Sequence, residues 1–185
     1  MNIENIVIIG GGPAGLSAAI YNARAELKPY LFGGSPPGGQ LTLTTDVENY
    51  PGYKSILGPD LIQKMRDQAK TFGTEIVDKN VQTVDFTKQP FKIVPAGKDA
   101  EPVHAKAVIL ATGAKALWLN LESEARLRGR GVSACATCDG FFFRDKVVAV
   151  VGGGDTAMED ALTLTKFAKQ VYVIHRRKEF RASKI

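Results

Sequence analysis

The two cysteines of this chain are its most chemically distinctive residues. They stand three positions apart in the segment Ala134-Cys135-Ala136-Thr137-Cys138-Asp139-Gly140, and the sequence holds no other cysteine. A Cys-x-x-Cys pair in a βαβ context is typical of a redox dithiol. Near a helix N-terminus one thiol of such a pair has a lowered pKa, because partial positive charge there favours the thiolate. Asp139 is placed to pass a proton to or from that thiolate.

Two other interpretations of the cysteine pair are a zinc half-site and a pair of inert core residues. A zinc site normally needs four ligands, and this chain offers two cysteines and two distant histidines, His104 and His175. We therefore expect no metal site. Inert cysteines are disfavoured by the spacing, by the adjacent carboxylate and by the nucleotide motifs on both sides.

A glycine-rich motif near the N-terminus predicts a dinucleotide site. The apolar run 5–9 is typical of a buried parallel strand, and it leads directly into Gly10-Gly11-Gly12-Pro13-Ala14-Gly15. Residues 16–25 then predict a helix, and residues 28–32 a second strand. The glycines of such a motif allow a tight turn and the close approach of a pyrophosphate, which lies at the helix N-terminus. An ordinary tight turn between strand and helix is the alternative.

The end of the second predicted strand lacks the acidic residue that usually binds a ribose hydroxyl. Gly33-Gly34-Ser35 stands there instead, so another group, such as backbone or water, would have to make that contact. Residues 33–53 form a long loop without regular period, and such loops are often functional. The candidate cofactor-binding residues of this region are Gly33, Gly39, Gln40, Leu41 and Asn49. The two amides suit a polar ring system, and hydrogen bonds to loop backbone are the alternative for them.

Hydrophobic periodicity predicts the remaining elements of the first half. Residues 58–72 predict an amphipathic helix with one apolar face. Four segments predict short antiparallel strands, at 75–77, 81–86, 91–94 and 102–104. The run 107–111 predicts a second buried strand. Because ligands lie at the strand ends of an open α/β sheet, Ala111, Thr112 and Gly113 are expected to face the cofactor.

A second glycine motif follows the cysteine pair. Residues 146–151 predict a buried strand, and Gly152-Gly153-Gly154-Asp155-Thr156-Ala157 repeats the fingerprint, with the alanine that the motif allows at its last position. Residues 158–168 predict a helix and residues 170–174 another strand. The candidate nucleotide-binding residues here are Gly152, Gly154, Asp155 and Thr156.

The end of that last strand is basic, where a site for NAD would carry an acid. His175, Arg176 and Arg177 stand there, with Arg181 beyond. An acid would repel a 2′-phosphate, whereas arginines bind it with paired donors. The pattern favours NADPH over NADH, and a solvated basic strand end is the alternative. We interpret His175 as a stacking or phosphate-side group, not as a catalytic base.

The charge distribution argues against a nucleic-acid partner. The chain has 185 residues and a formal net charge of +5, and residues 166–185 hold seven basic residues against Glu179 alone. Nucleic-acid binders more often spread basic residues over a face and interleave aromatics. No stretch predicts a membrane span, and the N-terminus has no basic n-region of a signal peptide. We expect a cytoplasmic protein, since a reducing compartment suits a cysteine pair that cycles.

Two dinucleotide motifs around one cysteine pair indicate an electron path, with one nucleotide as donor and a flavin as the other. Over residues 5–184 the sequence resembles the low-molecular-weight thioredoxin reductases. The shared motifs, in the same order, are Gly-Gly-Gly-Pro-Ala-Gly, Gly-Gly-Gln-Leu, Val-Glu-Asn-Tyr-Pro-Gly, Ala-Thr-Gly-Ala, Ala-Cys-Ala-Thr-Cys-Asp-Gly, Gly-Gly-Gly-Asp-Thr-Ala and His-Arg-Arg-Lys-Glu-Phe-Arg-Ala.

The resemblance implies an α/β fold with two Rossmann-like dinucleotide-binding domains of the three-layer ββα type, the second incomplete. Residues 1–113 would form the N-terminal part of an FAD-binding domain, and residues 114–185 a partial NADPH-binding domain that carries the cysteine pair. It also implies a homodimer, and a hydride path from NADPH through flavin to a Cys135–Cys138 disulfide and on to thioredoxin. By the same likeness Cys138 faces the flavin, Cys135 attacks the thioredoxin disulfide, and Asp139 is the acid/base.

Members of that family continue well past the last residue of this sequence. The resemblance therefore implies a C-terminally truncated chain, and we expect these residues alone not to turn over. One alternative is the reductase component of a peroxide-detoxifying system, which usually carries an additional N-terminal thioredoxin-like domain. A flavin dithiol oxidase that uses oxygen is a second, but it would not need the arginines after residue 174. A non-catalytic FAD-binding module is a third.

Overall fold

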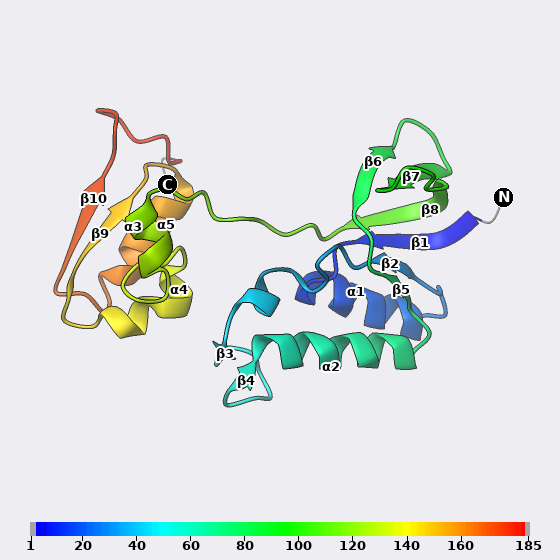
Figure 1. Ribbon diagram of the computed structural model, residues 1–185, viewed down its shortest axis with the longest axis horizontal. Helices are drawn as coiled ribbons and strands as arrows, with labels where there is room; N and C mark the ends of the chain where they lie inside the picture. The colour runs from blue at the N-terminus through cyan, green and yellow to red at the C-terminus, as the bar shows by residue number, and fades with distance from the viewer. Residues whose placement is uncertain (1–2, 184–185) are drawn as a thin grey trace. The chain divides into compact units, whose positions relative to one another are not determined.

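The computed structural model describes residues 3–183. The chain divides into two compact units, one up to Lys115 and one from Ala116 onward (Figure 1). Within the described residues, no helix has both the length and the apolar character that a membrane crossing requires.

A six-stranded sheet with the order β5-β2-β1-β8-β7-β6 forms the first unit (Figure 1). Its strands are β1 (Ile3–Ile9), β2 (Tyr30–Phe32), β5 (Glu75–Val77), β6 (Val81–Asp85), β7 (Phe91–Pro95) and β8 (Val103–Leu110). The first four strands in the sheet order are parallel, and β7 and β6 pair antiparallel at one side. Residues 6–9 of β1 are buried, as expected for an apolar run in the middle of a parallel sheet.

Two helices cover one face of this sheet, α1 (Pro13–Arg24) and α2 (Gly58–Thr71). Their apolar stripes meet the strands in a buried cluster that includes Ile8, Leu16, Leu31, Leu61 and Met65. Proline suits the first position of α1, because the N–H that it lacks would have no partner there. The helix begins at Pro13, three residues earlier than the hydrophobic pattern alone predicts.

The antiparallel strands β7 and β6, at one side of the same sheet, fold over the other face of its parallel strands. Val7 and Ile9 of β1 and Phe32 of β2 form a buried cluster with Ile93 of β7 and Ala105 of β8. The unit therefore has three layers, helices, parallel strands and antiparallel strands. This is the α/β architecture that the sequence predicts for the first dinucleotide-binding domain.

The long loop after β2 is ordered by short elements of its own. It contains a 3-10 turn, η1 (Gly39–Leu43), and two short strands, β3 (Asp46–Val47) and β4 (Ile56–Leu57), that pair antiparallel. Val47 is buried in the helix-side cluster, and Leu41 and Tyr50 pack against it. These apolar contacts hold the loop against the body of the unit.

The second unit is a small βαβ arrangement preceded by short helices. Its elements are α3 (Glu122–Leu127), α4 (Ala136–Asp139), a 3-10 turn η2 (Gly140–Phe143), β9 (Val147–Val151), α5 (Asp155–Leu164) and β10 (Gln170–Ile174). Strands β9 and β10 are parallel. Val147 and Val151 of β9 are exposed, and so are three consecutive residues of β10, Tyr172 to Ile174, so this unit has a much smaller core than the first.

Three details of the sequence prediction are wrong. The segment 75–77, predicted to be antiparallel, pairs parallel with β2, because α2 returns the chain as a crossover. The segments 102–104 and 107–111 form one strand, β8, since the residues between them continue the extended backbone. The stretch 114–132, for which the sequence analysis predicts no helix or strand, contains α3, whose Glu124 carboxylate accepts the N–H groups of Leu119 and Asn120.

The packing of α1 gives a direct test of the fold. Leu16 is fully buried between α1 and the sheet, whereas Tyr21 on the same helix is 77% exposed. We expect Leu16→Ala to lower the free energy of unfolding by about 2–5 kcal/mol through lost burial and a residual cavity, measured by urea denaturation followed by circular dichroism. Tyr21→Ala is the matched control and should change it by less than about 0.5 kcal/mol. Equal losses in the two variants would contradict the placement of α1.

Candidate functional site

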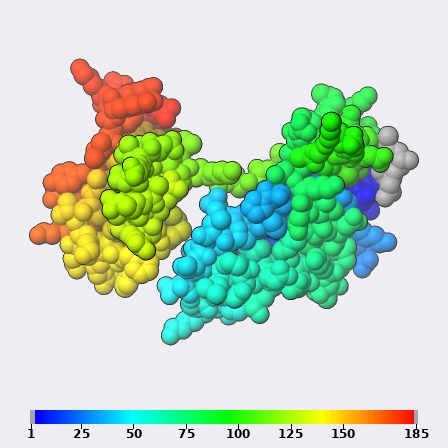
Figure 2. All heavy atoms as spheres, in the orientation of Figure 1, coloured from blue at the N-terminus to red at the C-terminus, as the bar shows by residue number. Residues whose placement is uncertain are grey.

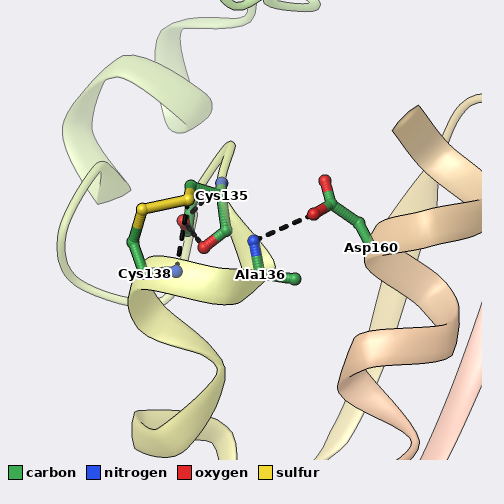
Figure 3. The surroundings of a disulfide bond; sticks show 5 residues. Cys135, Ala136, Cys138 and Asp160 are labelled. Carbon is green, nitrogen blue, oxygen red and sulfur yellow. Dashed lines mark hydrogen bonds between the residues drawn. A yellow bond between two sulfur atoms is a disulfide. The ribbon is translucent and has the colours of Figure 1, made fainter. Parts of the chain in front are cut away.

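The cysteine pair forms a disulfide, Cys135–Cys138, with 5.3 Å between the Cα atoms (Figure 3). Cys135 is the N-cap residue of α4, and its Sγ accepts a hydrogen bond from the Cys138 N–H at 3.2 Å. The Cys135 N–H donates to the Ser133 hydroxyl at 3.0 Å. Cys135 is half-buried and Cys138 is exposed, so the disulfide is open to attack by an external thiol.

The short helix that carries this disulfide packs on α5. Ala136, the first residue of α4, is buried, and its N–H donates to the Asp160 carboxylate of α5 at 3.1 Å (Figure 3). Asp139 ends α4 and is half-buried, and its N–H donates to the Cys135 carbonyl. Sequence analysis missed Asp160, because nothing in the local pattern links it to residues 24 positions earlier.

The first glycine loop brings three backbone segments into contact. Gly10 has φ +126°, and a Cβ there would collide with the Ala111 carbonyl that follows β8. A Cβ at Gly15, in the first turn of α1, would collide with the Gly10 carbonyl. The Ala111 N–H donates to the Ile9 carbonyl at 2.8 Å. Ala111 therefore lies against the glycine loop, and Thr112 and Gly113, which follow it, are exposed.

The N-terminus of α1 is suited to an anion. Its N-cap is Gly12 and its first residue is Pro13, and among the described residues no side chain caps it. A Cβ at Gly12 would meet no atom within 4 Å. The first-turn N–H groups, which begin at Ala14, have no partner within the helix. A pyrophosphate fits this open, uncapped helix end.

The long loop after β2 extends to the N-terminus of α1. A Cβ on Gly39 would lie 3.7 Å from the Gly12 Cα, so η1 stands beside the glycine loop. Leu41 packs against the core, which leaves Gln40 exposed next to it. Asn49 lies exposed after β3. These positions give η1 a place in the candidate flavin site, and a cofactor role for Asn49 stays a prediction.

A carboxylate does stand at the end of β2, although it comes from the neighbouring strand. A Cβ on Gly33 would lie 2.5 Å from Oδ1 of Asp78, the residue that follows β5. Asp78 is held by the buried Arg66 of α2 through two hydrogen bonds, at 2.8 and 3.0 Å. The sequence signal for Asp78 was an acid directly after a strand, but the neighbour of that strand was not predicted.

The second glycine loop is covered by the basic segment that follows β10. Gly154 is the N-cap of α5, and no described side chain caps that helix. The Gly153 carbonyl accepts the N–H groups of Arg181, at 2.6 Å, and Ala182, at 3.1 Å. The Asp155 carboxylate accepts the Ser183 N–H at 2.6 Å. This hydrogen bond holds the pKa of Asp155 below its usual range, and Thr156 beside it is exposed.

The His175 ring lies at the second loop as well. A Cβ on Gly153 would lie 2.5 Å from the His175 ring, which also faces the Phe180 ring at 5.6 Å. The His175 Nε2 is buried without a hydrogen-bond partner in the described part of the chain, as a group awaiting a polar ligand would be. A hollow is lined by Arg177, Lys178, Glu179, Phe180 and Arg181. The segment lies at the surface, red in Figure 2, with Arg176 exposed.

Between residues 3 and 183 there is no group of three or more His, Cys, Asp or Glu arranged to hold a metal ion. The chemistry that the described residues offer is thus thiol–disulfide exchange at Cys135–Cys138, with two nucleotide-type loops in the same chain.

Known proteins share this combination. The family model described as pyridine nucleotide-disulphide oxidoreductase matches residues 4–184. A thioredoxin reductase of Rickettsia conorii is 57% identical over 97% of this chain and 58% of its own length. A relative from Pseudomonas fluorescens named glucosaminate ammonia-lyase is 52% identical over 98% of this chain and 56% of its own length. The solved thioredoxin reductase of Giardia duodenalis is 46% identical, with a TM-score of 0.89 over 99% of this chain and 59% of that one.

The chain spans less than two thirds of the length of each of these proteins. The family description implies a flavin and a nicotinamide nucleotide, and the chain presents two glycine loops and a disulfide that suit them. From the match over residues 4–184, this chain belongs to the pyridine nucleotide-disulphide oxidoreductase family.

Proposed function

We propose that this chain serves an NADPH-dependent thioredoxin reductase, in which electrons pass from NADPH through FAD to the Cys135–Cys138 disulfide and on to thioredoxin. The observation that carries the proposal is the half-exposed disulfide on α4, packed against the helix that starts at the second glycine loop. The names of the Rickettsia and Giardia relatives support the choice of thioredoxin as the acceptor.

The first unit would hold FAD. The loop from Gly10 to Gly15 and the uncapped end of α1 fit its pyrophosphate. The ribose would lie at Gly33, near the Asp78 carboxylate. The ring system would lie along η1 and the end of β8, with Asn49 as an additional amide. When bound, this flavin supplies the capacity to accept a hydride from a nicotinamide and to return two electrons to a disulfide.

The second unit would hold NADPH. Gly152, Gly154, Asp155 and Thr156 surround the start of α5, where a pyrophosphate is favoured. We assign Arg176, Arg177 and Arg181 to the 2′-phosphate, and His175, whose ring lies beside Gly153, to stacking or phosphate contact.

The cysteine pair completes the cycle by thiol–disulfide exchange. Two electrons and two protons convert the Cys135–Cys138 disulfide into two thiols, and we assign the proton transfer to Asp139. The Cys135 thiolate attacks the disulfide of thioredoxin, which forms a mixed disulfide and releases one thioredoxin thiolate. Cys138 then attacks Cys135, which restores the intramolecular disulfide and releases dithiol thioredoxin. Cys138 is the cysteine that we assign to the flavin.

The proposal includes a homodimer and a cytoplasmic location, both taken from the resemblance to low-molecular-weight thioredoxin reductases. A reducing compartment suits this cysteine pair, because the pair cycles between disulfide and dithiol and must be reduced again in every cycle. A peroxide-system reductase, an oxygen-using dithiol oxidase and a non-catalytic FAD-binding module are less well supported, since no structural observation favours any of them over the reductase.

The flavin assignment is tested by an absorbance spectrum of the purified chain, recorded before and after anaerobic NADPH. We expect bound flavin that bleaches when NADPH is added, because both loops fit a dinucleotide.

Cys135→Ser and Cys138→Ser should keep the flavin but abolish thioredoxin reduction in the longer protein. Thr137→Ala, between the cysteines and exposed, is the control and should keep both. A protein that stays colourless with added FAD would contradict the first assignment, and undiminished thioredoxin reduction by a serine variant would contradict the dithiol mechanism.

The nucleotide preference depends on the basic segment after β10. We expect Arg176→Ala combined with Arg177→Ala to weaken NADPH binding by about a hundredfold or more, because each of the two charged hydrogen bonds lost contributes about 1.5–3 kcal/mol. NADH binding should change little. Lys169→Ala, which removes an exposed positive charge at the opposite end of β10, is the control and should change neither binding. The measurement is the dissociation constant, or the Michaelis constant, for each nucleotide. Equal weakening for NADPH and NADH would remove the 2′-phosphate assignment.

A further inference from the structure

Helix α4 is tied to α5 by a carboxylate at the position where the disulfide begins. The Ala136 N–H donates to the Asp160 Oδ1 at 3.1 Å (Figure 3). Ala136 is 7% exposed, and Ala161 and Leu164 on α5 are 8% and 9% exposed. A Cβ on Gly140 would touch the Phe167 ring at 3.1 Å. These apolar contacts and the hydrogen bond hold the Asp160 carboxylate at the start of α4.

This contact changes which donors a Cys135 thiolate can use. Because Cys135 is the N-cap of α4, its sulfur competes for the N–H groups of the first turn, which have no partner within the helix. Asp160 takes the Ala136 N–H, and the Cys135 carbonyl takes the Asp139 N–H. The Cys138 N–H donates to the Cys135 Sγ at 3.2 Å. The Asp160 carboxylate also brings a negative charge to Ala136, the residue next to Cys135.

We propose that Asp160 is a positioning residue for the redox pair, which holds α4 in place and keeps the Cys135 thiol more basic than the helix start alone would make it. A nearby negative charge disfavours the thiolate. A more basic thiol is a stronger nucleophile once deprotonated, and a less stable thiolate makes the dithiol a better reductant. The inference rests on the redox part of the proposed function, since it requires that Cys135–Cys138 be reduced and reoxidised.

Other charged groups belong to the same unit as the cysteine pair, and their influence on the Cys135 thiol must be distinguished from that of Asp160. Asp139 lies on α4 itself, and Arg144 follows η2 with its guanidinium over the Phe141 ring at 5.0 Å. Arg130 lies on the preceding loop, and Glu159 is the exposed neighbour of Asp160 on α5. Of these groups, only Asp160 has a hydrogen bond to the backbone of the cysteine segment.

The first experiment measures the pKa of the Cys135 thiol without flavin, NADPH or thioredoxin. The full chain carries Cys138→Ser, which leaves a single thiol, and the rate of alkylation by iodoacetamide is followed against pH. We expect Asp160→Asn, which keeps an oxygen acceptor but removes the charge, to lower the thiol pKa by about 0.5–1 unit. Glu159→Gln removes one charge from the adjacent exposed position and should leave it unchanged. Asp160→Glu, which restores the charge, should return it toward the wild-type value.

A purely structural cap would give a different result. Asp160→Asn would then leave the alkylation profile within about 0.2 units of the unsubstituted single-thiol chain, and that outcome overturns the proposal. So would an equal shift in Glu159→Gln, because the effect would then be one of net charge. Circular dichroism checks folding, and Asp160→Ser, which also removes the charge, replaces Asp160→Asn if the latter does not fold.

A second experiment uses the intact cysteine pair in equilibrium with glutathione. Two glutathione molecules give two electrons and two protons to the disulfide and become glutathione disulfide. Near pH 9, above the usual thiol pKa, Asp160→Asn should shift this equilibrium about three- to tenfold toward the protein dithiol. An unchanged constant overturns the role of Asp160 alone. A wild-type disulfide that neither glutathione nor excess dithiothreitol reduces overturns the redox function itself, so the two failures are distinguishable.

Discussion

The close approach of backbone at the first glycine loop is the constraint on which the first unit depends. Gly10 lies against the carbonyl that follows β8, and Gly15 lies against the carbonyl of Gly10. Without a Cβ at either place, the end of β1, the start of α1 and the end of β8 converge at one edge of the sheet. The convergence leaves the N-terminal N–H groups of α1 open. The same close backbone approach that joins β1, α1 and β8 thus creates an uncapped helix N-terminus, where a phosphate is favoured.

The sequence predicted the local elements well, because their signals are local. Apolar β-branched runs followed by glycines indicate strand, turn and helix wherever the chain folds, and both glycine loops are where the pattern predicted them. The direction in which a strand pairs could not be predicted from local signals. Whether the segment 75–77 pairs parallel or antiparallel depends on the path of α2 across the sheet, and a three-residue strand contains no information about its partner.

The site residues divide in the same way. The cysteine pair and the basic segment after β10 were predictable, because adjacent residues carry their chemistry. Asp78 and Asp160 were not, since each acts on a segment far away in the sequence, Gly33 and Ala136. An acid on a helix face or at a strand end is ordinarily a solvated surface group. Only the packing of Ala136 against α5, and of Arg66 beneath the end of β2, gives these two carboxylates a specific partner.

The basic segment over the second loop is held almost entirely by main-chain groups. The N–H groups of Arg181, Ala182 and Ser183 bond to the loop carbonyl of Gly153 and to Asp155, so the path of the segment does not require particular side chains at 176 and 177. Those two positions can therefore change in evolution while the segment keeps its place. Under the proposed 2′-phosphate assignment, a lineage could exchange one nicotinamide cofactor for the other by substituting a few surface side chains, with no rebuilding of the βαβ unit that supports them.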